Sequence, residues 1–200
     1  MSAQPQARLT EEQYLMVERA AEFKSEYYDG YMYARAGASA SHAQITGNLA
    51  RELGNALHQK PCGVMPNDLR VRVPPARFYT HPDVTVVCGE MRFADDQKDT
   101  LLNPTLLIEV LSTSTESHDR AFKFDRYGQI ESLQEFVLVS QFYPRIEFFR
   151  RQRANQWLFS VITGLGSTCT FESVGATIPL SEIYHRIEFA PESALLNGGI

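Results

Sequence analysis

Two largely apolar runs that do not alternate with polar residues, at residues 84–88 and 106–111, are the strongest hydrophobic signal in the chain. Runs without polar alternation predict strands that are covered on both faces. Residues 69–73 alternate instead between apolar side chains and arginine, so we expect one face of that strand to be buried. Residues 136–139 form another short apolar strand. We predict that these four strands belong to one sheet, with the two largely apolar runs at its centre.

Helical spacing predicts three helices. Thr10 and Gln13 form a capping-box pattern that begins a first, amphipathic helix. Leucine and isoleucine at i, i+4 intervals line one face of a second helix over residues 41–59. A third helix over residues 116–129 follows a run of serine and threonine, which are good N-caps. We expect the last two helices to pack on the sheet.

Turn residues add two further elements. Asp29-Gly30 is typical of a tight turn and precedes a short strand at residues 31–35. Alternating strands at 145–151 and 156–163 flank four polar residues and predict a hairpin. The polar, acidic residues 90–103 are expected to form an exposed loop. The predicted fold class is therefore α/β, with a central mixed β-sheet flanked by α-helices and an extra C-terminal β-hairpin.

Length and composition favour one domain. The chain has 200 residues, of which 44% are hydrophobic, and this is enough for a single substantial core. We expect residues 1–200 to form one domain, with the core of it over about residues 9–189 and a loosely ordered tail at 190–200. Residues 1–8 carry no apolar signal segment, and no run approaches the length of a membrane span. The expected location is cytoplasmic, without a membrane partner.

Cysteine usage and charge restrict the function classes. The three cysteines are scattered without metal-ligand spacing, so we expect reduced, structural thiols. The net charge of −5 argues against a protein sheathed in basic residues, which is the usual footprint of a nucleic-acid binder. Local arginine and lysine clusters remain, near residues 70–72, 120–126 and 145–153. Each of these is either a solvated face or part of a binding surface.

Two acids stand in or beside the apolar runs. Asp83 precedes the first run and Glu109 lies within the second, where an unpaired charge costs several kcal/mol. Paired carboxylates are typical ligands of magnesium, and the backbone carbonyl of Val110 is a further candidate ligand. Lys123 follows on the third helix. In the alternative interpretation, Asp83 only caps a turn and Glu109 pairs with Lys123 or with an arginine.

Three stretches carry a resemblance to a known family: IEVLSTST, HDRAFKFDRYGQIESLQEFVLVSQ and PRIEFFRR. With them, residues from about Leu9 to Phe189 resemble a bacterial family of restriction-endonuclease type, within the PD-(D/E)XK superfamily of nucleases. In that comparison Asp83 matches the first acid and Glu109 the second. The superfamily's usual lysine is replaced by Leu111, and a lysine recurs in this family where Lys123 stands. The resemblance implies that the Lys123 ammonium orients or helps to deprotonate the attacking water.

Four further residues are candidates for supporting roles. Glu26 and His42 occupy positions typical of the family, where Glu26 would add a metal or outer contact and His42 would meet the substrate or the acids. A salt bridge for Glu26 and a helix-start position for His42 are the plain alternatives. Tyr127 and Gln129 lie one to two turns beyond Lys123 and are candidates to support its orientation.

The resulting hypothesis is a magnesium-dependent endonuclease that hydrolyses phosphodiester bonds in DNA, with catalytic residues Asp83, Glu109 and Lys123 and with Mn²⁺ as a substitute metal. Nucleases that cut both strands often act as dimers, so a homodimer is a further option. One rival is an inactive nuclease fold kept for DNA binding or assembly, which the acidic charge and the relocated lysine favour. Another is a nuclease acting on RNA or branched DNA. Motifs of other hydrolases and of nucleotide-binding loops are absent from the sequence.

Overall fold

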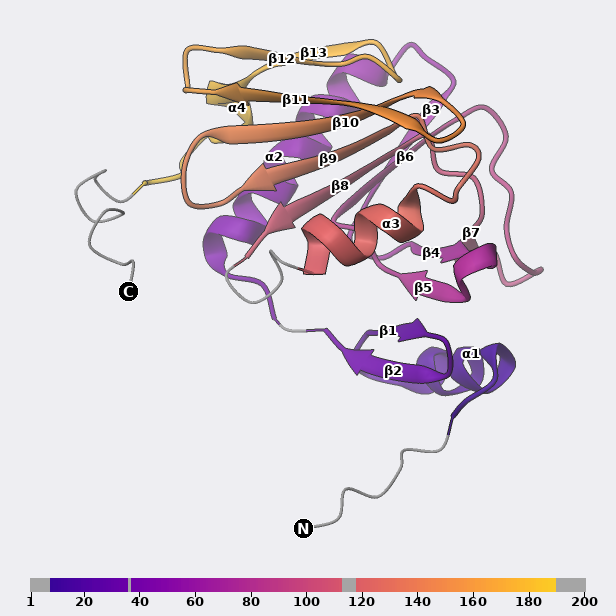
Figure 1. Cartoon of the computed structure of the whole chain (residues 1–200). Coiled ribbons are helices and arrows are strands. Elements are labelled where there is room, and N and C mark those ends of the chain that lie inside the picture. The colour runs from indigo at the N-terminus through magenta and orange to yellow at the C-terminus, as the bar shows by residue number, and fades with distance from the viewer. Residues whose placement is uncertain (1–7, 36, 113–117, 190–200) are drawn as a thin grey trace.

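The computed structural model describes residues 8–35, 37–112 and 118–189, and a six-stranded sheet lies at its centre (Figure 1). The strand order is β11-β10-β9-β8-β6-β3. β8 and β9 are parallel, and every other neighbouring pair in this sheet is antiparallel. The strands are β3 (Cys62–Pro66), β6 (Val84–Cys88), β8 (Leu106–Leu111), β9 (Glu135–Ser140), β10 (Arg145–Arg153) and β11 (Gln156–Thr163).

The mixed sheet and its central strands were predicted correctly. β6, β8 and β9 are neighbours, and all six residues of β8 and of β9 are buried, as unbroken apolar runs indicate. The predicted hairpin also exists, as β10 and β11. It is not an extra element, however, because β10 pairs with β9 along five residues and so extends the central sheet.

The prediction that residues 69–73 join this sheet was wrong. The chain turns away after β3 at Asn67, whose φ is +56°, and β4 (Arg70–Val73) enters a second sheet with the order β2-β1-β5-β4-β7. Its other strands are β1 (Ser25–Tyr28), β2 (Tyr31–Ala34), β5 (Phe78–Thr80) and β7 (Thr100–Leu101). β3, which the sequence pattern did not reveal, takes the edge position beside β6. Alternation along 69–73 indicated a strand but not its partner.

A tight turn joins β1 and β2. Asp29 and Gly30 have φ values of +42° and +101°, which is the left-handed pair that a two-residue hairpin turn requires. The predicted turn and the strand after it are therefore confirmed. The hairpin brings Glu26 on β1 and Arg35, directly after β2, toward the six-stranded sheet. The pattern of polar and apolar residues around Glu26 and Arg35 does not predict that either residue comes close to this sheet.

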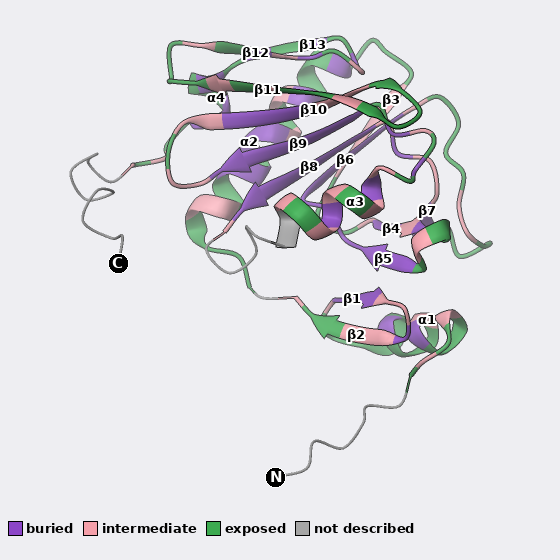
Figure 2. Ribbon diagram, viewed as in Figure 1, coloured by how far each residue is buried: buried purple, intermediate pink, exposed green. Residues whose placement is uncertain are grey.

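The long helix α2 (Ala40–Leu57) covers one face of the six-stranded sheet (Figure 1). Its buried stripe packs against apolar side chains from alternate positions of the central strands, and Figure 2 shows this buried centre. The stripe consists of Ile45, Leu49, Leu53 and Leu57, which meet Val84, Val86, Ile108, Val110, Val137 and Val139. The first helix, α1 (Glu11–Ala20), begins with the expected capping box at Thr10. Both predictions are confirmed.

The third helical segment lies against the opposite face of the sheet. It contains a π-helix, η2 (His118–Lys123), followed by one α-helical turn, α3 (Phe124–Tyr127). The predicted helix was longer, and its residues 116 and 117 lie outside the described residues. Aromatic packing holds the segment, because the Tyr127 and Phe136 rings are 5.1 Å apart and edge to face. A π-helix is rare and is frequently found at functional sites.

A small C-terminal unit was not predicted. It consists of the hairpin β12 (Thr168–Phe171) and β13 (Ala176–Pro179) and the short helix α4 (Leu180–Ile183). Its apolar residues join the core on the α2 side of the sheet. The short 3₁₀ turn η1 (Pro74–Ala76) links β4 to β5. The tail at 190–200 lies outside the described residues, and none of the described helices is long and apolar enough to cross a membrane.

The expectation of three reduced cysteines was wrong for two of them. Cys62 on β3 and Cys88 on β6 face each other across the antiparallel pair and form a disulfide. Their separation of 26 residues hides this pairing, which depends on the strand register. Cys169 is free and buried, and burial raises the pKa of its thiol to about 12. That thiol is therefore a packing group rather than a reactive one.

Candidate active site

Asp83 and Glu109 lie on the same face of the central sheet. In the antiparallel pair of β6 and β8, Val84 is opposite Ile108, so Asp83 comes opposite Glu109 one residue further along. Directly opposed residues point to the same side, with Cβ atoms about 4.5–5.5 Å apart. Asp83 Oδ2 also accepts the Val110 N–H at 2.8 Å, which ties the start of β6 to β8. Both acids are only 2% exposed.

Lys123 reaches the second acid from the helical segment. Its Nζ lies 3.0 Å from Glu109 Oε1 and 3.2 Å from Glu26 Oε1. Lys123 is 4% exposed. The plain alternative for Glu109, a pair with Lys123, is therefore present in the structure, but the lysine also contacts a second carboxylate. An ammonium group between two buried carboxylates is a strong electrostatic arrangement, because little water is present to screen it. The π-helix delivers the group to this position.

Tyr127 and Thr80 fix the two glutamates. The Tyr127 hydroxyl donates to Glu109 Oε1 at 2.6 Å, and the Thr80 hydroxyl donates to Glu26 Oε1 at 2.7 Å. Burial raises the pKa of Tyr127 well above its usual value, so its hydroxyl keeps its proton and remains a donor. Each glutamate is thus held in one orientation by a neutral donor and by Lys123.

Asp83 has two cationic or titratable partners. His42 Nε2, from the first turn of α2, lies 3.0 Å from Asp83 Oδ2, and an Arg35 terminal nitrogen lies 3.3 Å from Oδ1. Burial by itself raises the pKa of Asp83. This effect is outweighed by the hydrogen bond and charge of His42, by the Val110 N–H and by the charge of Lys123, so the net shift of the pKa is downward. Asp83 is therefore ionised at neutral pH.

Arg35 belongs to the site although the sequence analysis did not select it. Burial lowers the pKa of its guanidinium, and the charges of Glu109, Asp83 and Glu26 outweigh that effect and raise it. The guanidinium thus lies in the field of all three acids. A single arginine after a turn carries no pattern that distinguishes it from a surface arginine, so only the folded arrangement could identify it.

The structure brings most of the predicted site residues together and leaves one of them outside the site. Glu26, His42 and Tyr127 join Asp83, Glu109 and Lys123. Gln129 does not, because its side chain is exposed and its amide donates to the Asp125 carbonyl at 3.3 Å. Val110 packs its side chain in the core on the α2 side and gives its N–H to Asp83. A metal-binding role for its carbonyl oxygen stays a prediction.

The donor set of the site suits a hard cation. Its oxygen ligands are carboxylates, and magnesium commonly takes one or two protein carboxylates and completes its shell with water and phosphate oxygens. Across residues 8–35, 37–112 and 118–189, no group of three or more histidine, cysteine, aspartate or glutamate side chains is arranged to hold a metal ion. A site for magnesium would therefore rest on the pair Asp83 and Glu109.

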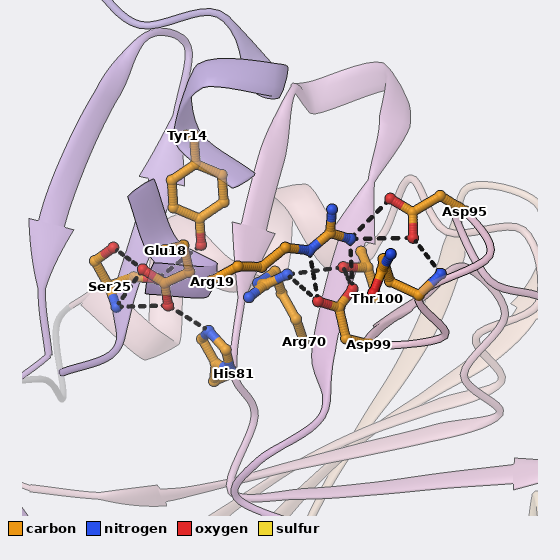
Figure 3. Close-up of polar contacts among 10 residues, drawn as sticks. Tyr14, Glu18, Arg19, Ser25, Arg70, His81, Asp95, Asp99 and Thr100 are labelled. Atoms are coloured by element: carbon orange, nitrogen blue, oxygen red, sulfur yellow. Dashed lines mark hydrogen bonds and ion pairs between the residues drawn. The ribbon is translucent and has the colours of Figure 1, made fainter. Parts of the chain in front are cut away.

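A second polar network holds the segments that carry two of the site acids (Figure 3). The buried Glu18 of α1 accepts hydrogen bonds from both the N–H and the hydroxyl of Ser25, and lies 3.2 Å from His81 Nε2. Ser25 immediately precedes Glu26, and His81 is two residues before Asp83. Burial lowers the pKa of His81 to about 4, so the ring is neutral at pH 7. One carboxylate therefore links β1 to the segment before β6.

Further along the same network, Arg19 ties α1 to the loop that was predicted to be merely exposed. Its guanidinium binds Asp95 and Asp99, in each case at 2.7 Å, as drawn in Figure 3. Arg70 binds Thr100 at 2.9 Å beside them. These pairs fix the loop over β4 and β7. They are structural contacts, separate from the residues gathered around Asp83 and Glu109.

Substituting Glu18 with glutamine tests this support. The amide keeps the shape of the side chain but loses the negative charge, and hydrogen bonds to charged groups contribute about 1.5–3 kcal/mol. We expect the free energy of unfolding, measured with urea, to fall by about that amount. Glu12→Gln on the exposed side of α1 is the matched control and should change it by less than about 0.5 kcal/mol. An equal effect of the two substitutions would contradict the linking role of Glu18.

The structure combines a mixed sheet flanked by helices with two buried acids on one sheet face and a lysine between carboxylates. Together these features define a restriction-endonuclease-like protein. Residues 11–180 match the Uma2 family, described as "Putative restriction endonuclease", and the chain belongs to this family.

Two relatives and one solved structure are similar to this chain. The proteins sll1609 and slr1290 of Synechocystis sp. (strain ATCC 27184 / PCC 6803 / Kazusa), both described as uncharacterized, are 36% and 32% identical to this chain. Their alignments cover 82% and 92% of this chain and 92% and 96% of the relatives. A crystal structure from Anabaena variabilis ATCC 29413, described as a "putative nuclease belonging to DUF820", matches with a TM-score of 0.71 at 16% identity. It covers 88% of this chain and 97% of that one, and at this identity it shows the shared fold.

Proposed function

We propose that this protein is a magnesium-dependent endonuclease that hydrolyses phosphodiester bonds in DNA. The observation that carries the proposal is the Lys123 ammonium, which lies 3.0 Å from Glu109 and 3.2 Å from Glu26 within a buried site that also contains Asp83. A lone structural ion pair needs one acid, whereas this lysine joins two and a third acid lies on the same face. Acids and a compact cation at one point are the groups that phosphodiester hydrolysis uses.

In this proposal Asp83 and Glu109 hold the metal, with the Val110 carbonyl as a further ligand. A magnesium ion bound there would supply Lewis-acid activation of the phosphoryl group and would lower the pKa of a water molecule. Lys123 orients that water and favours its deprotonated form through its positive charge. Tyr127 keeps Glu109 in place through its 2.6 Å hydrogen bond, and His42 does the same for Asp83.

Arg35 has a distinct role in the proposed reaction. Its guanidinium lies 3.3 Å from Asp83 and remains positively charged at every working pH. In the resting protein it offsets the charge of Asp83. A planar guanidinium is also well suited to contact a phosphate oxygen of the substrate, and Arg35 would serve this role in the proposed reaction. Glu26 meanwhile retains Lys123 through the 3.2 Å contact.

The experiment that tests the function is a cleavage assay on supercoiled plasmid, single-stranded DNA, branched DNA and RNA. Magnesium should support cleavage of plasmid DNA, manganese should replace it, and a chelator should stop the reaction. Calcium also takes oxygen ligands, so we expect it to bind to the acids. Its larger and more flexible coordination shell should not support cleavage rates comparable to those with magnesium. Cleavage that persists in chelator would contradict the metal dependence, and cleavage of RNA alone would replace DNA as the substrate. We place this activity in the cytoplasm. Cleavage of both DNA strands would require two active sites, which a homodimer would supply.

The rival proposal is a nuclease fold that binds DNA or assembles without catalysis. Leu111 in place of the superfamily's usual lysine favours it, as does the net charge of −5. DNA binding with no cleavage under any metal would support this rival. Metal-dependent cleavage that is lost on substitution of a site acid would exclude it.

A further inference from the structure

A second buried acid with two arginines lies beside the candidate active site. Glu147 on β10 is 3% exposed, and its Oε1 accepts a hydrogen bond from Arg145 Nε at 2.7 Å. Its other oxygen, Oε2, accepts a hydrogen bond from Arg120. One guanidinium is thus held on each oxygen of a single carboxylate. We call these three residues the Glu147 cluster.

The strand register places this cluster on the face that carries the site. Leu138 on β9 is the partner of Glu109 on one side and of Glu147 on the other. Glu147 therefore lies on the same face as Glu109, two strands away, at a distance of about 10 Å. Arg120 is on the π-helix, three residues before Lys123. In Figure 1, β8 and β9 end at the edge of the sheet where β10 begins.

The two arginines reach solvent although their acid does not. The side chains of Arg120 and Arg145 are 32% and 34% exposed, whereas that of Glu147 is 4% exposed. Burial raises the pKa of Glu147, and the hydrogen bonds and charges of Arg120 and Arg145 lower it by more, so the acid stays ionised at neutral pH. The cluster carries two positive charges and one negative charge. Both guanidinium groups are therefore accessible to solvent beside the proposed site of hydrolysis.

The cluster is also fixed in advance. The backbone of Arg145 is held at both polar groups by Tyr184, whose hydroxyl accepts from the Arg145 N–H at 3.1 Å and donates to its carbonyl at 2.8 Å. The side chain is held by Glu147. Guanidinium groups that are ordered beforehand lose less entropy when they bind an anion. Stability alone does not explain the arrangement, since apolar residues in place of a buried ion pair are often equally or more stabilising.

We propose that Arg120 and Arg145, held by Glu147, form a subsite for the phosphate backbone of duplex DNA beside the scissile bond. The proposal rests on the proposed function and names how this acidic protein would hold its substrate. Guanidinium groups bind phosphate oxygens through paired N–H donors. Duplex DNA carries one negative charge per ~1.7 Å of axis, so guanidinium groups held by an acid two strands from Glu109 are within reach of neighbouring phosphates of the same duplex.

The test is the binding of a short fluorescent DNA duplex, measured by anisotropy across a salt series without divalent cation, so that no cleavage occurs. Arg145→Ala should weaken binding roughly eightfold at about 0.1 M salt and reduce the slope of log affinity against log salt by about 0.9. Arg120→Ala should do the same, and the double variant should lose about twice that slope. Arg51→Ala is the matched control, because Arg51 is a half-exposed, ion-paired arginine on α2. It should leave affinity and slope unchanged.

A second variant separates a lost contact from lost stability or lost charge. Arg145→Ala with Glu147→Gln removes one charge of each sign, so the net charge is unchanged and no unpaired acid remains buried. It should fold with a sharp urea transition and still lose a slope of about 0.9. If this variant and Arg120→Ala both keep the parental affinity and the parental salt slope, the proposed subsite is overturned, even if the parent protein cleaves DNA. A parent that neither binds nor cleaves DNA would overturn both the subsite and the proposed function.

Discussion

Glu109→Gln is expected to abolish magnesium-dependent cleavage, with a loss of at least about a thousandfold in rate. Lewis-acid stabilisation by a metal contributes several kcal/mol to such a reaction, and each 1.36 kcal/mol is about tenfold in rate. Glutamine keeps the shape of the side chain and its hydrogen bond from Tyr127 but loses the charge that would bind the cation. Cleavage should be measured with plasmid DNA at saturating magnesium, and magnesium binding by calorimetry. Both should fail together.

Glu135→Gln is the matched control for this substitution. Glu135 is also a buried glutamate on a central strand, and it pairs with Arg150 at 2.8 Å. It lies at the opposite end of β9, where its register partner on β8 is Leu106. Both variants should lose stability, because removing one partner of a buried ion pair costs about 3–5 kcal/mol. Only Glu109→Gln should lose cleavage. Equal activity of the two variants would remove Glu109 from the catalytic site.

Lys123→Ala is expected to lower magnesium-dependent cleavage at least roughly a hundredfold, in line with the loss of one preorganised electrostatic group. At an exposed lysine, the same substitution would leave folding nearly unchanged. The structure changes that expectation, because Lys123 is buried between Glu109 and Glu26, and its removal leaves two acids without their shared cation. We therefore expect the free energy of unfolding without metal to fall by about 3–5 kcal/mol.

Magnesium distinguishes a catalytic from a merely structural lysine. If a cation binds at Asp83 and Glu109, it should return part of the stability that Lys123→Ala loses, since it neutralises the same acids. Cleavage should remain low even where stability is restored. Lys60→Ala is the control: the Lys60 ammonium also holds defined partners, the carbonyls of Val174 and Gly175, at a position outside the site cluster. A Lys123→Ala protein that cuts DNA at the parental rate would exclude the lysine from the mechanism.

The distribution of charge around the candidate site bears on the proposed polyanionic substrate. The net charge of −5 describes the whole molecule, whereas the groups around the candidate site include Lys123, Arg35, Arg120 and Arg145. Electrostatic attraction of a ligand depends on the local field at the cleft more than on the total charge. Counting charges along the sequence could not reveal this grouping, because the four residues come from three separate segments.

Local patterns were sufficient for the central strands, α2 and the pair of acids. An apolar run forms a covered strand almost irrespective of its neighbours, and a carboxylate inside such a run needs a partner wherever it packs. Asp83 and Glu109 therefore carry their own signal. The Asp29-Gly30 turn does so too, because its left-handed backbone is a property of those two residues. Lys123 was recognised through the resemblance of its surrounding segment to a family.

Contacts between distant segments required the tertiary structure. The strand β4 left the central sheet, Cys62 met Cys88, and Arg35 joined the site, while Gln129 turned to solvent. Periodicity states which face of an element is buried but not which element covers it. Strand register and the direction of each turn decide that, and they depend on the packing of the whole chain. The identity of the acids is thus a local property, whereas the cations and donors that make them a site are set by the fold.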